Sequence, residues 1–195
     1  MLMETMQPDV ELIPYGEMRR LTRREYERLR AEHFFGNERV ELLFGTVVTM
    51  PPVDSRHTES TYRLHALLAK KLDARARVYC QSAFAAADDS EPQPDVYVTA
   101  PASHWDDNPS RAHLVVEIAN SSLRRDRIVK ARLYSRVDVE EYWIVDINAG
   151  TVEVYRDQDA GQWRTITTHR RGETISPLAF PDVVIAVSEI VPPID

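Results

Sequence analysis

Residues 113–120, HLVVEIAN, have the composition of a strand buried on both faces, because five of the eight residues are aliphatic. Glu117 interrupts this apolar run, and Asp95 interrupts a second one, QPDVYVTA, at residues 93–100. An unpaired ionised carboxylate in such a strand is energetically costly. A divalent cation commonly compensates two converging carboxylates, and such an ion can activate water for phosphodiester hydrolysis. The two strands therefore predict a metal-binding site.

Each carboxylate also has a simpler interpretation. Asp95 follows Pro94 and could be a turn or strand-entry residue. Glu117 has no turn or helix cap nearby, but it could form a structural ion pair with Lys130 or with an arginine. Both interpretations stay open at the level of single residues.

A lysine from the helix expected over residues 122–137 completes the candidate site. At 100° per residue, Leu123, Lys130 and Tyr134 lie on one face of this helix, and that face must pack against the sheet. An ammonium group directed at the two carboxylates could neutralise them, position a water or stabilise a developing phosphorane charge. The alternative is a packed lysine stem with its ammonium in water.

The remaining elements predict an α/β fold with a mixed sheet, because strands alternate with helices and hairpins stand at both ends. The chain has six glycines and no glycine-rich phosphate loop, which argues against a doubly wound nucleotide-binding fold. Helices are expected at about 22–32, 56–76 and 122–137. Strands are expected at about 39–50 (two), 78–86, 93–99, 113–119, 141–147, 151–157, 161–169 and 182–187.

Length and composition predict one cytoplasmic domain. Residues 1–18 contain two prolines and no periodicity, so we take them as an N-terminal arm before a single domain at residues 19–195. No apolar run is long enough to span a membrane, and the N-terminus lacks the pattern of a secretory signal. Cys80 is the only cysteine, which excludes an internal disulfide and a cysteine-based zinc site.

The formal net charge of −7 argues against a protein that coats nucleic acid, because phosphate binding depends on lysine and arginine. A local basic groove remains compatible with this charge. Arginines cluster in residues 19–30 and 124–136, and each cluster could line such a groove or form a solvated helix face.

Two further residues, Glu41 and His57, are candidates for the site, but each also has a common structural interpretation. Glu41 alternates with Val40 and Leu42, so a solvent-facing strand position is its default. His57 stands at the start of the second expected helix, where a capping or surface histidine is commoner than a ligand.

Four motifs together resemble the Uma-two family of restriction-type endonucleases, a branch of the PD-(D/E)XK nuclease superfamily. They are QPDV, LVVEIANSS, a helix that contains a lysine and LY, and VDVEEYWIVD. RVELLFGTVVTMPPVDSRH also resembles the opening of the family, where a glutamate and a glycine precede a histidine and the first long helix. The resemblance covers about residues 20–190. It implies a restriction-endonuclease-like fold, with a central mixed sheet flanked by helices.

The resemblance also implies roles for individual residues. Asp95 matches the aspartate of the PD motif and Glu117 the acidic residue of the second motif, and both would bind Mg²⁺ or Mn²⁺. Ala119 stands where the superfamily usually has a lysine, and Lys130 occupies the position that substitutes for it in this branch. Glu41 matches an early glutamate and would be an additional metal or water ligand.

Two other implications concern the core and the partners. Tyr142 and Trp143 match an aromatic pair of the family, and we expect them to pack beneath the sheet. Nucleases of this kind act on DNA and commonly work as dimers, so the resemblance implies a DNA substrate and a possible homodimer.

Three functions are compatible with the sequence. The first is a metal-dependent DNA endonuclease that uses Asp95, Glu117, Glu41 and Lys130. The second is an inactive descendant that binds a nucleic acid or a protein and keeps the acids as an ion-pair cluster. The third is an enzyme that uses the acids for metal-free general acid and base catalysis. The absence of helix-turn-helix or zinc-finger spacing argues against a transcription factor.

Overall fold

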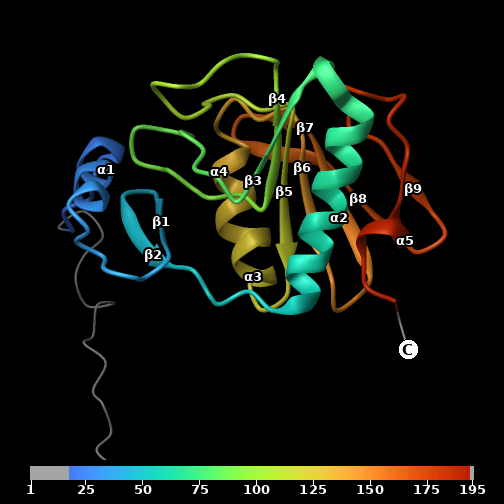
Figure 1. Ribbon diagram of the computed structural model, residues 1–195, viewed down its shortest axis with the longest axis horizontal. Coiled ribbons are helices and arrows are strands. Elements are labelled where there is room, and N and C mark those ends of the chain that lie inside the picture. Colours follow the sequence, from blue (N-terminus) through green and yellow to red (C-terminus); the bar gives the residue numbers. More distant parts are fainter. Residues whose placement is uncertain (1–17, 194–195) are drawn as a thin grey trace, which may run out of the picture.

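A six-stranded mixed sheet forms the centre of the computed structural model, which describes residues 18–193 (Figure 1). The predicted arm at residues 1–18 therefore lies outside the described residues, except for Met18. The strand order is β3-β4-β5-β6-β7-β8; β5 and β6 are parallel, and the other neighbours are antiparallel. The strands are β3 Arg77–Cys80, β4 Val96–Thr99, β5 Leu114–Ala119, β6 Tyr142–Asp146, β7 Thr151–Asp159 and β8 Gln162–Arg170. The predicted mixed α/β fold is confirmed.

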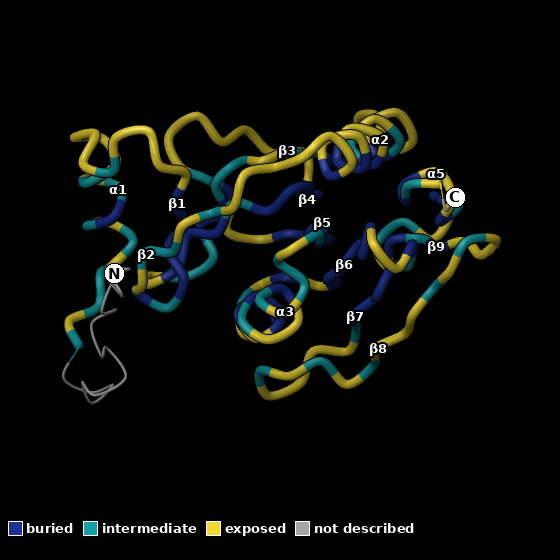
Figure 2. The backbone as a smooth tube through the Cα atoms, turned by 90° about the horizontal axis from the view of Figure 1, so that it is seen from below, coloured by how far each residue is buried: buried dark blue, intermediate teal, exposed yellow. Residues whose placement is uncertain are grey.

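Helices cover both faces of this sheet (Figure 2). One face packs against α2 (Ser55–Leu72), which continues into the short 3-10 turn η3 (Asp73–Arg75). The other face packs against a continuous helical segment, which consists of α3 (Leu123–Arg125), the π-helical turn η4 (Asp126–Lys130) and α4 (Ala131–Tyr134). The helix predicted over residues 122–137 thus exists, with a π-helical turn in its middle.

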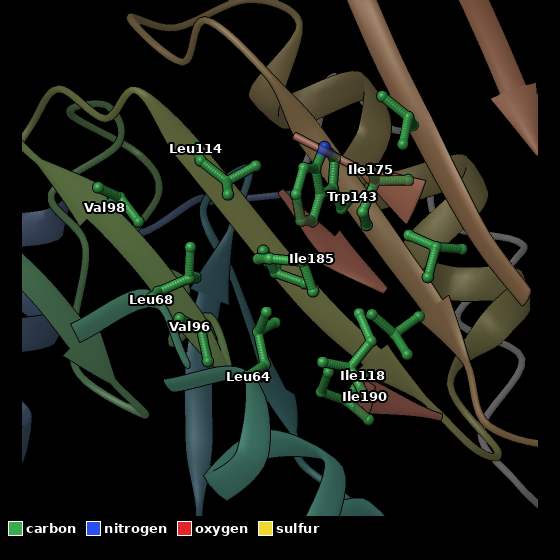
Figure 3. Packing of buried hydrophobic residues seen from close by; sticks show 14 of the residues in the cluster. Leu64, Leu68, Val96, Val98, Leu114, Ile118, Trp143, Ile175, Ile185 and Ile190 are labelled. Carbon is green, nitrogen blue, oxygen red and sulfur yellow. The ribbon is translucent and has the colours of Figure 1, made fainter. Parts of the chain in front are cut away.

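The two faces of the sheet carry separate apolar clusters, because successive strand residues point in opposite directions. In β5, Val116 and Ile118 face α2, whereas Val115 and Ala119 face α4. Figure 3 shows the cluster under α2, where Leu64 and other helix residues meet the strands. All six residues of β5 are buried, as the apolar run predicted.

Smaller elements stand at both ends of the chain. Helix α1 (Arg23–Ala31) begins at a capping box, in which Thr22 and Glu25 each accept a hydrogen bond from the other's backbone N–H. It is followed by the hairpin β1 (Val40–Leu43) and β2 (Thr46–Thr49). Near the C-terminus, β9 (Thr174–Ile175) pairs with β10 (Ile185–Ala186), and α5 (Val187–Ile190) follows.

Three predictions about local structure need correction. The strand expected at 78–86 ends at Cys80, because Gln81 has a φ of 46° and leaves the extended conformation. The last expected strand shrinks to the two residues of β10. Tyr142 and Trp143 are both buried, but they belong to the sheet itself and pack on its two opposite faces rather than beneath it.

Candidate active site

The site is centred on Glu117, at the middle of β5 on the face that packs against η4 and α4. Its neighbours on this face are Val115 and Ala119, and Glu117 is only 4% exposed. Val96 pairs with Val116 across the antiparallel strands β4 and β5, so Asp95 lies opposite Glu117. Strand pairing therefore brings together two acids that are 22 positions apart in the sequence.

Asp95 is held at the point where the chain enters β4. The structure places it directly before the strand rather than inside it. Its Oδ2 accepts a hydrogen bond from the backbone N–H of Ile118 at 2.8 Å and lies 3.1 Å from Nε2 of His57. The strand-entry interpretation is therefore correct for its position, but the carboxylate is buried and faces the site.

Lys130 forms the connection between the carboxylates. Its Nζ lies 2.9 Å from Oε1 of Glu117 and 3.1 Å from Oε2 of Glu41, and the residue is 2% exposed. The hydroxyl of Tyr134, one helical turn later, donates to the same Oε1 of Glu117 at 2.9 Å. The ammonium group is thus directed toward the sheet, and the alternative in which it reaches water is wrong.

Glu41 reaches the site from β1, outside the central sheet. It is completely buried, so the solvent-facing position expected from its alternation is wrong. Its Oε2 accepts a hydrogen bond from the backbone N–H of Gln93 at 3.3 Å, whereas its Oε1 has no hydrogen-bond partner among residues 18–193. The hairpin packs against the loop before β4 through Leu42, which pairs with Glu91. This contact turns Glu41 inward.

Asp126 is a member of the site that the sequence analysis missed. It is 1% exposed, accepts a hydrogen bond from the hydroxyl of Ser122 at 2.6 Å and lines the same pocket as Lys130. Both residues belong to the π-helical turn, in which the N–H of Ala131 bonds to the carbonyl of Asp126. Such turns are frequent at functional sites. The available signal was its position four residues before Lys130, on the same helix face.

A polar network also fixes the start of α2 at the site. Asp54 caps the helix by accepting from the N–H of His57 at 2.9 Å, and its other oxygen accepts a hydrogen bond from the side chain of Asn120. Asn120 directly follows β5, so this contact ties α2 to the end of that strand. The arrangement holds the His57 ring against Asp95. The capping interpretation of His57 was therefore incomplete, because the cap itself is Asp54.

Burial and mutual repulsion govern the electrostatics of the acids. Burial raises the pKa of Glu117 well above the usual carboxyl range; the Lys130 ammonium opposes this effect, and the carboxylates of Asp95, Asp126 and Glu41 reinforce it. Burial alone would lower the pKa of Lys130, but Glu117, Glu41 and Asp126 together raise it. The lysine therefore stays protonated and is the main counter-charge of the site.

The pKa values of Asp126 and His57 are also shifted by burial and by neighbouring charges. Burial raises the pKa of Asp126, against the opposing effect of Lys130. Burial would lower the pKa of His57, but its hydrogen bond to Asp95 and the nearby charge of Asp54 raise it. The site thus concentrates more acidic groups than one lysine can neutralise, which favours binding of a further cation.

Asp95, Glu117, Asp126 and Lys130 line a small pocket of about 60 Å³, which has room for an ion or about two water molecules. Within residues 18–193, no group of three His, Cys, Asp or Glu side chains stands close enough together to hold a metal ion by itself. Mg²⁺ does not require such a cage, since proteins usually hold it by one or two carboxylates with water and substrate phosphate. The oxygen-only acids and the unpartnered Oε1 of Glu41 fit this kind of ion.

Comparison with known proteins identifies the group to which this fold and site belong. Residues 23–188 match the Uma2 family, which is described as "Putative restriction endonuclease". The chain belongs to the Uma2 family. This membership agrees with the resemblance seen in the four sequence motifs, and it extends over α1, the hairpin, the central sheet and both helical layers.

A solved structure supports the fold of this Uma2 protein. It is described as "a putative nuclease belonging to DUF820 from Anabaena variabilis ATCC 29413" and matches with a TM-score of 0.69 and 15% sequence identity. The match covers 87% of this chain and 97% of the other, so the two proteins share their fold. No curated protein matches the chain in sequence. Among residues 18–193, no helix is both long and apolar enough to cross a bilayer.

Proposed function

We propose that this protein is a metal-dependent endonuclease that hydrolyses phosphodiester bonds in DNA. One observation carries the proposal: Lys130 is buried between Glu117 and Glu41, with Asp95 directly before the adjoining strand, in a member of a family described as "Putative restriction endonuclease". Structural acids and lysines are mostly at the surface, whereas this group lies at the base of a pocket. A nuclease needs such a combination to bind a cation and to act on phosphate.

The acids are the candidate ligands of Mg²⁺ or Mn²⁺. Asp95 and Glu117 would hold the ion, and Glu41 would add its unpartnered Oε1 or orient a water molecule. The ion would supply Lewis-acid activation of the phosphate and of the attacking water. His57 and the N–H of Ile118 hold Oδ2 of Asp95 in place, and Oδ1 lies 3.5 Å from Nε2 of Gln81.

Lys130 would act on the charge that develops during hydrolysis. The oxygen of a water attacks phosphorus and the water gives up one proton, while the bond to the leaving oxygen breaks and the leaving oxygen takes up one proton. The Lys130 ammonium can donate hydrogen bonds to the attacking water or to the phosphate oxygens, which gain negative charge in the transition state. The hydroxyl of Tyr134 keeps Glu117 oriented during this step.

A homodimer stays a prediction of the family resemblance.

A binding module without catalysis is the second candidate. It is favoured by the short distances from Lys130 to Glu117 and Glu41, because the lysine already compensates part of the acidic charge. In that case the cluster would be structural, and the fold would present a nucleic-acid or protein binding surface. The two candidates differ in whether the site takes up a cation.

Calorimetric titration with Mn²⁺ tests the proposal without a chosen DNA substrate. We expect the wild type to bind Mn²⁺ and Asp95→Asn to lose most of the affinity, because one of the ligands loses its charge. Asp106→Asn is the matched control, since Asp106 is exposed on a loop, and it should bind as the wild type does. Absence of Mn²⁺ binding by a folded wild type would favour the binding module, and binding by all three proteins would place the ion elsewhere.

A further inference from the structure

A second cavity opens beside the site pocket, and we call it the flanking cavity. It has a volume of about 730 Å³, which lies in the range of small-molecule sites. One wall consists of residues 49–52, and the other of residues between 121 and 129, at and just before the start of the helical segment. Figure 1 shows the chain that leads from β2 toward α2. The two cavities share residues 50–52 and Arg125. One extended molecule can therefore occupy both.

Arg125 lies where the two cavities meet. Its Nη1 donates to the backbone carbonyl of Thr49 at 3.2 Å, which joins the two walls of the flanking cavity. Its Nε is buried and has no hydrogen-bond partner among the described residues. An arginine fixed in this way still has free donors in a geometry that matches phosphate oxygens.

The lining of the flanking cavity is basic and contains no acidic residue. It includes Arg124 and Arg125, and neither forms a salt bridge within residues 18–193. Arg127 of the same helical segment, by contrast, is paired with Glu153. Arg125 interacts electrostatically with Asp126, but neither arginine contacts a carboxylate of the described residues directly. In a chain with a net charge of −7, two arginines without a direct ion pair favour the binding of an anion at this place.

Hydroxyl and apolar side chains share the rest of the lining. Met50, Pro51 and Val129 contribute to it, and Ile128 is 57% exposed there although it is a large aliphatic residue. Phosphate contacts alone would not require an apolar wall. The combination fits a nucleotide whose phosphate meets the arginines while its sugar and base contact the aliphatic groups. A paired base in a duplex would not present its face to such a wall, whereas an unpaired base would.

We propose that the flanking cavity binds the nucleotide next to the scissile phosphate of an unpaired nucleic-acid strand. This inference rests on the proposed nuclease function and names its substrate as single-stranded or locally unpaired. Arg125 holds the phosphate between the two cavities, Arg124 contacts the next phosphate, and Ile128 packs against the base. The strand then runs from the flanking cavity into the pocket that contains Glu117.

Fluorescence anisotropy with a labelled single-stranded DNA 12-mer of mixed sequence, in the presence of EDTA, tests this inference. We expect Arg125→Gln to weaken binding about tenfold, because one phosphate contact is lost. Over about 50 to 200 mM salt, the slope of log affinity against log salt should fall by about 0.7 for this single strand. Arg124→Gln should act in the same direction, and Ile128→Ser should weaken binding without changing the salt slope.

Arg132→Gln is the matched control, because Arg132 is an exposed arginine of the same helical segment that lines neither cavity. It should bind as the wild type does. Circular dichroism establishes that each variant is folded, and Arg124→Gln, an exposed position, keeps the test valid if Arg125→Gln unfolds. Equal losses in Arg132→Gln, or unchanged binding in the three cavity variants, would overturn the inference.

Two comparisons separate this inference from the proposed function. A duplex of the same sequence that binds as tightly as the single strand would overturn the unpaired substrate. A wild type that binds no oligonucleotide would also overturn it. If Arg125→Gln loses single-strand binding and the wild type takes up no Mn²⁺, the nucleotide site in the flanking cavity would be supported. The proposal of a metal-dependent nuclease would then be contradicted.

Discussion

At the scale of the residue, the buried ammonium of Lys130 decides how the site is stabilised. Its two partners, Glu117 and Glu41, are almost fully shielded from water, and removal of the lysine would leave both without a counter-charge. We expect Lys130→Met to lower the free energy of unfolding by about 3–5 kcal/mol in the absence of metal, because breaking a buried pair leaves uncompensated charge. Thermal unfolding measures this loss.

The same variant also reports on the cation. Mn²⁺ bound between the two carboxylates would replace the missing charge, so Mn²⁺ should raise the melting temperature of Lys130→Met more than that of the wild type. Lys70→Met, at an exposed position of α2, is the control and should show neither effect. A Lys130→Met variant that is as stable as the wild type would show that the ion pair contributes no net stability.

At the scale of the element, α1 is held to the hairpin and its neighbouring loop by a buried acid. Glu91 is 1% exposed and accepts a hydrogen bond from Nη1 of Arg30 at 3.0 Å. Burial raises the pKa of Glu91 to about 7, the carboxylate of Glu27 adds to this, and Arg30 opposes it. Since the pKa is raised in the folded state, the folded protein binds more protons than the unfolded chain between about pH 4.5 and 7.

The stability that protonated Glu91 contributes should therefore be complete below about pH 4.5 and lost as the pH rises toward 7. A shift of this size corresponds to at most about 3 kcal/mol. We expect Glu91→Gln, which mimics the protonated acid, to lose less stability than the wild type between pH 5 and about pH 7.5. Urea unfolding at the two pH values measures the difference. Parallel losses in both proteins would contradict the assignment, and Glu59→Gln, at an exposed position, serves as control.

Most elements of this fold could be predicted because their signals are local. The apolar run around Val116 predicted a strand buried on both faces, and the helix expected at about 22–32 is α1, which Thr22 and Glu25 cap. The end of β3 could not be predicted, because it depends on the left-handed conformation of Gln81. The two-residue strand β10 also depends on its tertiary partner β9.

Some residues of the site could also be predicted from local sequence, and others could not. Glu117 and Lys130 could be recognised because each is polar in an otherwise apolar pattern, and the structure brings them within 2.9 Å. Glu41 alternates as a surface residue does, and only the packing of its hairpin buries it. Asp126 lies on the helix face that also carries Lys130, and its burial was visible only once the π-helical turn was known. The catalytic roles of these residues stay predictions.

At the scale of the whole molecule, the central sheet connects two cores that share no helix. The cluster under α2 contains Leu68 and Trp143, and the cluster under α4 contains Leu133 and Tyr142. Neighbouring residues of β4, β5 and β6 point into opposite clusters, so both clusters depend on the same strands. If these strands separate, the apolar residues of both clusters become exposed. The single domain at residues 19–195 stays a prediction, and the shared sheet is a physical reason to expect that residues 18–193 unfold together.

Matched substitutions on the two faces test whether the molecule unfolds as one unit. Leu68→Ala and Leu133→Ala remove equal side-chain volume from the two clusters, at positions that are at most 1% exposed. Each should lower the free energy of unfolding by about 2–5 kcal/mol, because each leaves a cavity. If the sheet couples the two cores, tryptophan fluorescence and far-ultraviolet circular dichroism should give coincident transitions in both variants. A variant in which tryptophan fluorescence and helical signal change at different urea concentrations would show instead that one face unfolds first, and that the site between β5 and η4 belongs to a separate unit.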